Sequence, residues 1–77
     1  MAQEIDHDSP VPPYLQVVGI IEAQIASGEL ASGARVPSIT TLVQTYGIAK
    51  NTAIRALGHL RDRGLVEIKP GWGTFVA

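Results

Sequence analysis

Apolar residues recur along residues 48–64 with the spacing of a single helix face, and the opposite face is polar apart from Ile54. Two arginines precede Gly64. Cations stabilise the negative end of a helix dipole, and glycine readily adopts the left-handed cap, so we expect the helix to end there. The pattern predicts one amphipathic helix. Its apolar positions, at i, i+3, i+4 and i+7, are Ala53, Ala56, Leu57 and Leu60.

Two further helices are predicted upstream. The first runs from Pro13, where a proline costs no hydrogen bond, to about Ser27, before Gly28. The second runs from Ile39 to about Tyr46, with Ser38 as its cap, Gly47 at its end and a short turn before the helix of residues 48–64. This pairing is a helix-turn-helix pattern. The predicted inward positions are Tyr14, Val17, Val18, Ile21, Ile25, Leu42 and Val43.

After Gly64 the hydrophobic period changes from 3.6 to 2, which predicts a β-hairpin: a strand over residues 65–69, a turn over 70–73 and a returning strand over 74–77. Val66 and Ile68 should share one face of the first strand. The segment Arg35-Val36, before a proline, should be extended. The expected fold class is α+β, mainly α: a winged helix-turn-helix of three helices and a C-terminal hairpin over residues 13–77.

The segment ahead of this domain, residues 1–12, is acidic and rich in proline, and we predict a flexible arm. The 77 residues are enough for one small domain. No cysteine is present, no apolar run has membrane length, and no basic signal region opens the chain, so we expect a cytoplasmic protein without a membrane segment.

The sequence does not predict an enzyme. His7 and His59 have no cysteine to join as metal ligands, and the chain has neither a phosphate-binding loop nor an H-E-x-x-H motif. The cluster Asp6-His7-Asp8-Ser9 lies in the predicted arm, where it lacks the rigid orientation of a catalytic triad. We therefore expect no cofactor and no metal.

Charge is divided unevenly between the two halves of the chain, although the net charge is only −1. Residues 1–34 contain five acidic residues and no lysine or arginine, whereas residues 35–77 contain all six basic residues and two acidic ones. A basic half can attract a polyanion locally, with an affinity that depends on how many phosphates it neutralises.

Five short blocks of residues follow one another from the end of the first predicted helix to the hairpin. The blocks are Glu29-Leu30 with Gly33 and Arg35-Val36-Pro37-Ser38; Tyr46-Gly47-Ile48; Asn51-Thr52 with Ala56-Leu57; Leu60 with Arg63-Gly64-Leu65-Val66; and Gly71-x-Gly73-Thr74-Phe75-Val76. In this order they resemble the DNA-binding domain of the GntR (gluconate repressor) family, and the resemblance extends from Pro13 to Ala77.

The resemblance implies a bacterial transcription regulator, most simply a repressor, which binds double-stranded operator DNA with two half-sites as a homodimer. The third helix would enter the major groove and the wing the minor groove. Lys50 stands where the family usually has a base-reading arginine, Asn51-Thr52 match its DNA-contacting pair, and Gly71 matches its wing glycine. The candidate DNA-binding residues are Arg35, Ser38, Lys50, Asn51, Thr52, Arg55, Lys69, Gly71 and Trp72.

The sequence departs from the family pattern at four positions. Thr40 and Ile54 replace arginines that commonly contact DNA, Ala49 occupies the usual cap of the third helix, and Trp72 replaces a polar or basic wing tip. With Ala49 as a poor cap, the helix start could fray or move to Asn51.

Several residues keep more than one interpretation. Lys50 could contact a phosphate or a guanine, and Asn51 could cap the helix or read an adenine. Arg55 and Lys69 could contact phosphates or be solvated. Ile54 could meet a thymine methyl group, pack on a partner or be exposed. Trp72 could fold back onto the sheet, lie against a groove wall or dock into a protein.

A rival function belongs to another class: a degenerate winged helix that binds a protein through Ile54 and Trp72. Members of the family usually continue beyond the wing into an effector-binding or dimerisation domain, whereas this sequence ends at Ala77, which fits an excised domain and a stand-alone regulator equally. We expect no effector site in these residues, and dimerisation through the first helix, the arm or the DNA.

Overall fold

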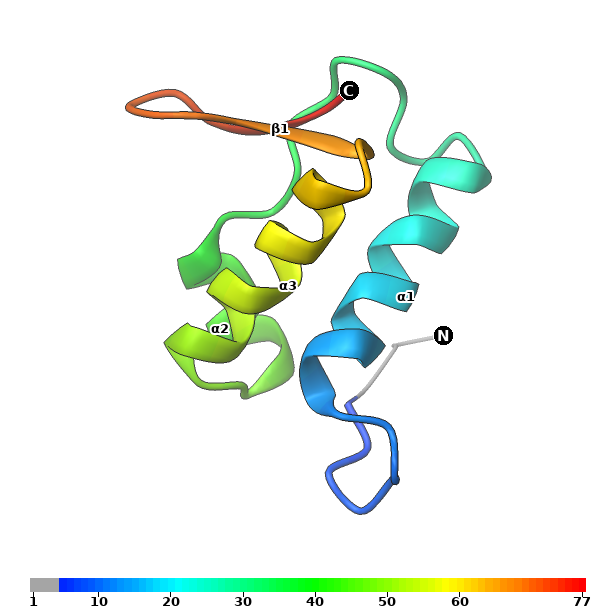
Figure 1. Ribbon diagram of the computed structural model, residues 1–77, viewed down its shortest axis with the longest axis vertical. Helices are drawn as coiled ribbons and strands as arrows, with labels where there is room; N and C mark the ends of the chain where they lie inside the picture. The colour runs from blue at the N-terminus through cyan, green and yellow to red at the C-terminus, as the bar shows by residue number, and fades with distance from the viewer. Residues whose placement is uncertain (1–4) are drawn as a thin grey trace.

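The computed structural model describes residues 5–77 as three helices followed by a two-stranded antiparallel hairpin (Figure 1). This is the predicted winged helix-turn-helix, and the predicted bounds agree with the observed ones to within a residue or two. The elements are α1 (Pro13–Ala26), α2 (Ile39–Tyr46), α3 (Lys50–Asp62), β1 (Val66–Lys69) and β2 (Gly73–Val76).

The ends of α2 are set by its flanking residues. The Ser38 hydroxyl oxygen accepts a hydrogen bond from the Thr41 amide at 3.2 Å, as expected of an N-cap. Gly47 ends the helix in the left-handed region, with a φ of 64°. A side chain there would be strained, so the glycine permits the tight turn into α3.

The start of α3 differs from one of the sequence-based alternatives. The helix begins at Lys50 and is preceded by an extended Ala49 that makes no side-chain cap. Asn51 lies within the first turn and does not restart the helix, so its predicted capping role is wrong. Gly64 adopts a φ of 76° just after the helix, as predicted.

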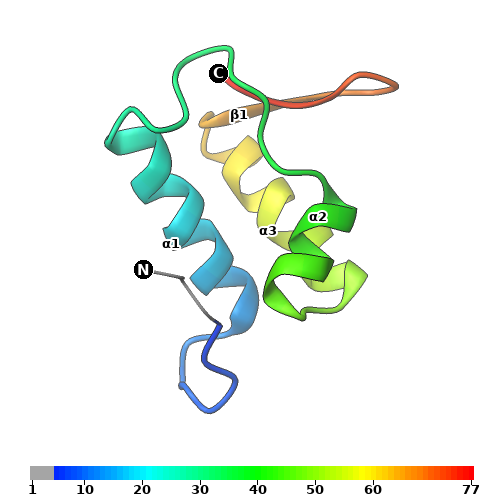
Figure 2. The same ribbon diagram turned by 180° about the vertical axis from the view of Figure 1, so that it is seen from behind.

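The core is built around α3. Helix α1 packs along one side of it, α2 packs on another side and β1 follows from its end, so the buried stripe of α3 meets all three elements (Figures 1 and 2). All four positions predicted for this stripe are buried, as are Leu42 and three of the five positions predicted for α1. The buried apolar residues are Val17, Val18, Ile21, Val36, Leu42, Ile48, Ala53, Ala56, Leu57, Leu60, Val66 and Val76.

The hairpin is anchored to the body by the extended segment that precedes α2. The Val36 amide donates to the Thr74 carbonyl at 2.8 Å, and the Val76 amide donates to the Ala34 carbonyl at 2.8 Å. Residues 34–36 therefore pair with β2 on the side away from β1. The sequence predicted this segment to be extended, but not its pairing.

The outer end of the hairpin projects beyond the helices (Figure 1). Val66, at the inner end of β1, is buried, whereas Ile68 is 41% exposed although it alternates onto the same face. The predicted alternation of the strand is thus present, but only its inner end is covered by the core.

The described part of the predicted arm, residues 5–12, folds against the start of α1. The Gln16 side-chain amide donates to the carbonyls of Asp6 and Val11, both at 2.8 Å, and its oxygen accepts from the Asp6 amide. Residues 1–4 of the arm lie outside the described residues, and its flexibility stays a prediction. In residues 5–77 no helix is long and apolar enough to cross a membrane.

We expect Leu60→Ala to lower the free energy of unfolding by about 2–5 kcal/mol, because it leaves a cavity at a fully buried position of α3. Ile54→Ala removes a similar aliphatic side chain from the exposed face of the same helix and should change stability by no more than about 0.5 kcal/mol. Urea unfolding followed by circular dichroism measures both. Equal losses would contradict the assignment of the two faces.

Candidate nucleic-acid interface

The first turn of α3 carries two predicted site residues in the open. Lys50 and Asn51 are both exposed, and Thr52 is half-buried. No carboxylate pairs with Lys50 among residues 5–77. With an uncapped N-terminus, this turn presents a free cation, an amide side chain and unpartnered backbone amides to solvent. These groups suit an anionic partner.

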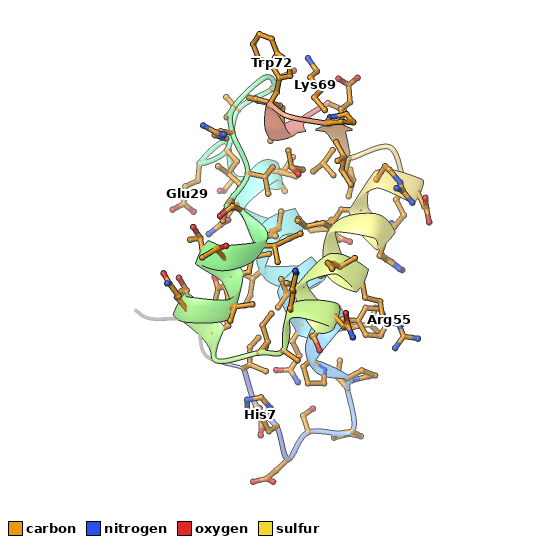
Figure 3. The ribbon with its side chains drawn as sticks, turned by 90° about the vertical axis from the view of Figure 1, so that its left-hand side faces the viewer. His7, Glu29, Arg55, Lys69 and Trp72 are labelled. Atoms are coloured by element: carbon orange, nitrogen blue, oxygen red, sulfur yellow. The ribbon has the colours of Figure 1, made fainter. Side chains whose placement is uncertain are left out.

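Arg55 lies on another side of α3. Its guanidinium carbon is 4.5 Å from the centre of the Tyr14 ring, a cation–π contact with α1. The Tyr14 ring also meets His59 edge-on, with centroids 6.2 Å apart. Figure 3 shows Arg55 on the side of α3 away from α2. The structure therefore separates Arg55 from Lys50, and a phosphate contact by Arg55 stays a prediction.

The wing tip exposes its tryptophan. Trp72 is 74% exposed and extends from the outer end of the hairpin, with Lys69 beside it (Figure 3). The interpretation in which Trp72 folds back onto the sheet is therefore wrong, because the turn places its side chain beyond the part of the hairpin that packs on the core. Its backbone is ordered by the turn, in which the Trp72 amide donates to the Lys69 carbonyl at 2.9 Å.

Arg35 ties this tip to the body. Its Nη2 donates to the Trp72 carbonyl at 2.8 Å, and its guanidinium carbon lies 5.9 Å from the centre of the Phe75 ring. A Cβ built on Gly73 would be 3.1 Å from two guanidinium nitrogens, so any other residue would crowd Arg35 and require it to shift. Arg35 is thus engaged within the protein and fixes the position of the wing.

The structure brings the candidate residues together in two groups. Five of the nine line one open hollow of about 410 Å³, which lies among the hairpin, the start of α2 and Leu57 of α3. Lys50, Asn51 and Thr52 form the second group at the first turn of α3, with Arg55 on the flank. The residues of the first group are Arg35, Ser38, Lys69, Gly71 and Trp72.

Pairing with acids reduces the number of cations available to a ligand. Arg63 forms an ion pair with Glu22 of α1, and Arg61 contacts Asp62 at 3.2 Å. Lys69 lies 4.0 Å from Glu67 and also 5.4 Å from the centre of the Phe75 ring. Arg35, Lys50 and Arg55 have no carboxylate partner within the described residues, and Arg35 is already bonded to the Trp72 carbonyl, so Lys50 and Arg55 are the cations left available to an anion.

Sequence reasoning missed two features of this surface. The contact between Arg35 and the Trp72 carbonyl joins residues 37 positions apart, and no local sequence pattern predicts it. The available signal was the pair of glycines at positions 71 and 73, because a glycine at a turn often marks a place where another group approaches the backbone closely. Tyr14 was predicted only as a core residue, and the face of its ring also holds the Arg55 guanidinium.

The chain matches known proteins over nearly its whole length. A family model described as "Bacterial regulatory proteins, gntR family" matches residues 13–76. The HTH-type transcriptional repressor NagR of Bacillus subtilis is 36% identical over 73 residues, which are 95% of this chain and 30% of NagR. The histidine utilization repressor of Klebsiella aerogenes is 41% identical over 69 residues, 90% of this chain and 29% of that repressor. The chain thus spans about a third of the length of these relatives.

Solved structures match the fold closely. The DNA-binding domain of AraR in complex with operator ORX1 has a TM-score of 0.90 at 30% identity and covers 97% of this chain and 95% of its own. YtrA from Sulfolobus acidocaldarius, a GntR-family transcription factor, has a TM-score of 0.88 at 32% identity and covers 99% of this chain and 80% of its own.

We expect Gly73→Ala to destabilise the protein by about 2–3 kcal/mol, because the backbone φ of 125° strains any side chain and the new Cβ would crowd Arg35. Gly71→Ala is the matched control: its φ is 78°, but nothing lies within 4 Å, so only about 1 kcal/mol of backbone strain is expected. Urea unfolding of both variants measures the difference. In an Arg35→Ala background the part of the cost that comes from crowding should disappear while the backbone strain remains, so Gly73→Ala should cost less there. An unchanged cost would refute the proposed crowding.

Proposed function

Because the chain belongs to the GntR family of bacterial regulatory proteins, we propose that it binds operator DNA as the DNA-reading domain of a transcriptional repressor. The observation that carries this proposal is the open first turn of α3, with unpaired Lys50, on a domain that superimposes on an operator-bound relative. Relatives named as repressors, NagR and the histidine utilization repressor, support repression as the direction of control.

Helix α3 would lie in the major groove, with its first turn against the base edges. Lys50 can donate to guanine O6 and N7 or to a phosphate, as a point charge without the fork of an arginine. Asn51 makes no cap and is exposed, so its amide is free for the paired donor and acceptor of adenine. Thr52, half-buried behind them, suits a contact with the sugar-phosphate backbone.

The wing would lie along the adjacent minor groove. Gly71 lets the backbone approach the sugar-phosphate chain, and the exposed Trp72 ring offers an apolar surface for a groove wall or sugar. Lys69 can reach a phosphate from the outer strand. Arg35 acts here mainly as a positioning residue, because its guanidinium is bonded to the Trp72 carbonyl and so sets the angle of the wing.

Two candidates would contact the phosphates on either side of the groove. The Arg55 guanidinium, held on the Tyr14 ring, is in place for a phosphate beside α3. The Ser38 hydroxyl already accepts a hydrogen bond from the Thr41 amide and lies 3.0 Å from the Thr41 hydroxyl. A phosphate contact by Ser38 at the start of α2 would therefore be made alongside its capping role.

Binding would use two copies of the chain on two half-sites. One domain has few free cations and can neutralise few phosphates, and the affinity for DNA rises with the number of phosphates neutralised. A second copy on a two-fold operator would double that number and raise the affinity. Since bacterial chromosomal DNA lies in the cytoplasm, this function implies a cytoplasmic protein.

We expect the full chain to bind duplex DNA from upstream of its own gene more tightly than a scrambled duplex, and to lose about 10³-fold in affinity between roughly 50 and 200 mM salt if about six phosphates are contacted. Lys50→Ala should weaken binding by at least about tenfold, the cost of one charged contact. Fluorescence anisotropy of labelled duplexes measures these affinities.

Arg63→Ala is the matched control, because it also removes one positive charge but from a residue paired with Glu22 on the α1 side. It should change affinity less than about threefold, the size of a screened, distant charge. Equal losses of affinity in both variants would show that binding depends on net charge alone and not on the position of Lys50. Absence of binding at 50 mM salt would overturn the proposal.

We expect the fluorescence of Trp72, the single tryptophan of the chain, to report on the wing. The side chain is 74% exposed in the free protein, so saturating operator DNA should protect it from acrylamide, lowering the quenching constant by about half or more if the ring enters the groove. The scrambled duplex at the same concentration and salt is the control. Unchanged quenching at saturation would contradict a DNA contact by Trp72.

A further inference from the structure

Ile54 differs from the other large aliphatic residues of α3. Leu57 and Leu60 are at most 3% exposed, whereas Ile54 is 45% exposed and lies outside the buried stripe. A single exposed aliphatic residue is common on protein surfaces and by itself needs no explanation. The groups around this one make it informative.

The surroundings of Ile54 are cationic and polar. At 100° per residue, Lys50 lies one turn earlier within about 40° of Ile54, and Asn51 lies within about 60° on the other side. The one acidic side chain of α3, Asp62, is two turns further on and contacts Arg61 at 3.2 Å. This charge pattern is complementary to a polyanion, and it would oppose a partner that buries apolar surface against the same face.

A base edge in the major groove offers donors, acceptors and one apolar group, the C5 methyl of thymine. The isoleucine side chain has methyl groups and no donor or acceptor, so the thymine methyl is the one feature of the groove it can recognise. Helical side chains lean toward the N-terminus, and this directs Ile54 toward the bases that Lys50 and Asn51 face. Its branched Cβ allows few rotamers, so little entropy is lost on contact.

We propose that Ile54 is a specificity-determining residue that reads a thymine methyl group next to the base pairs contacted by Lys50 and Asn51. The proposal rests on the proposed function and deepens it: each half-site should contain a thymine beside the positions that depend on Lys50 and Asn51. Position 54 would select for thymine by apolar contact and would disfavour cytosine, which lacks the C5 methyl group and presents an amino group in place of the thymine O4.

The test uses the full chain and the duplex that it enriches from a randomised DNA library. Each thymine of one half-site is replaced singly by deoxyuridine, which removes only the methyl group. We expect one position to weaken binding about fourfold, the value of one buried methyl group. With Ile54→Ala that position should become insensitive, while the other thymines keep their effects. Ile54→Val, which retains the branched Cβ, should preserve at least half of the free-energy difference.

The outcomes separate the two proposals. If no duplex is enriched and binding is absent at low salt, the proposed function fails. If a duplex is enriched and bound, but no deoxyuridine substitution acts differently on the wild-type chain and Ile54→Ala, the assignment of Ile54 fails alone. Circular dichroism of Ile54→Ala confirms that the helix is retained, as expected for an exposed position.

Discussion

The packing of α3 against its neighbours is the constraint on which the rest of the structure depends. One stripe of this helix, containing two alanines and two leucines, is buried against α1, α2 and β1 at once. The small Ala53 and Ala56 let neighbouring elements approach the helix axis, and Leu57 and Leu60 fill the space between them. Because the stripe is fixed, the rest of the helix surface is fixed as well, and Lys50, Asn51 and Ile54 stay exposed beside a core they do not join.

A second, smaller constraint connects the wing to this body. The wing has only two short strands, and an isolated hairpin is marginally stable in water. Residues 34–36 pair with β2, and Arg35 reaches the Trp72 carbonyl at the tip, so both ends of the hairpin are held by the segment that leads into α2. The start of the helix-turn-helix and the wing are thereby one mechanical unit, and a change at Gly73 affects the position of Trp72.

The fold could be predicted from the sequence because its signals are local. Helical spacing identified the stripe of α3, and Ser38, Gly47 and Gly64 marked helix boundaries through capping chemistry that needs only neighbouring residues. The candidate site was less accessible. Its positions came from the family resemblance, and the partners of Arg35 and Arg55 lie across the fold in residues distant in sequence. The exposure of Trp72 could not be predicted either, because it depends on how far the hairpin extends beyond the helices.

Along α3, the residues that stabilise the fold are different from those proposed to contact DNA. A chain of this size buries only about 60% of the surface exposed on unfolding, so each residue of the buried stripe matters for folding. Lys50, Asn51, Ile54 and Trp72 are exposed and lie outside that core, so we expect substitutions there to alter the presented surface without altering the fold. Arg35 and Gly73 are the exception. They belong to both systems, because the contact that holds the wing in place also sets what the wing presents. The proposed recognition surface can therefore change on the open face of α3 without a cost to the core, while a change at Arg35 or Gly73 also alters the position of the wing.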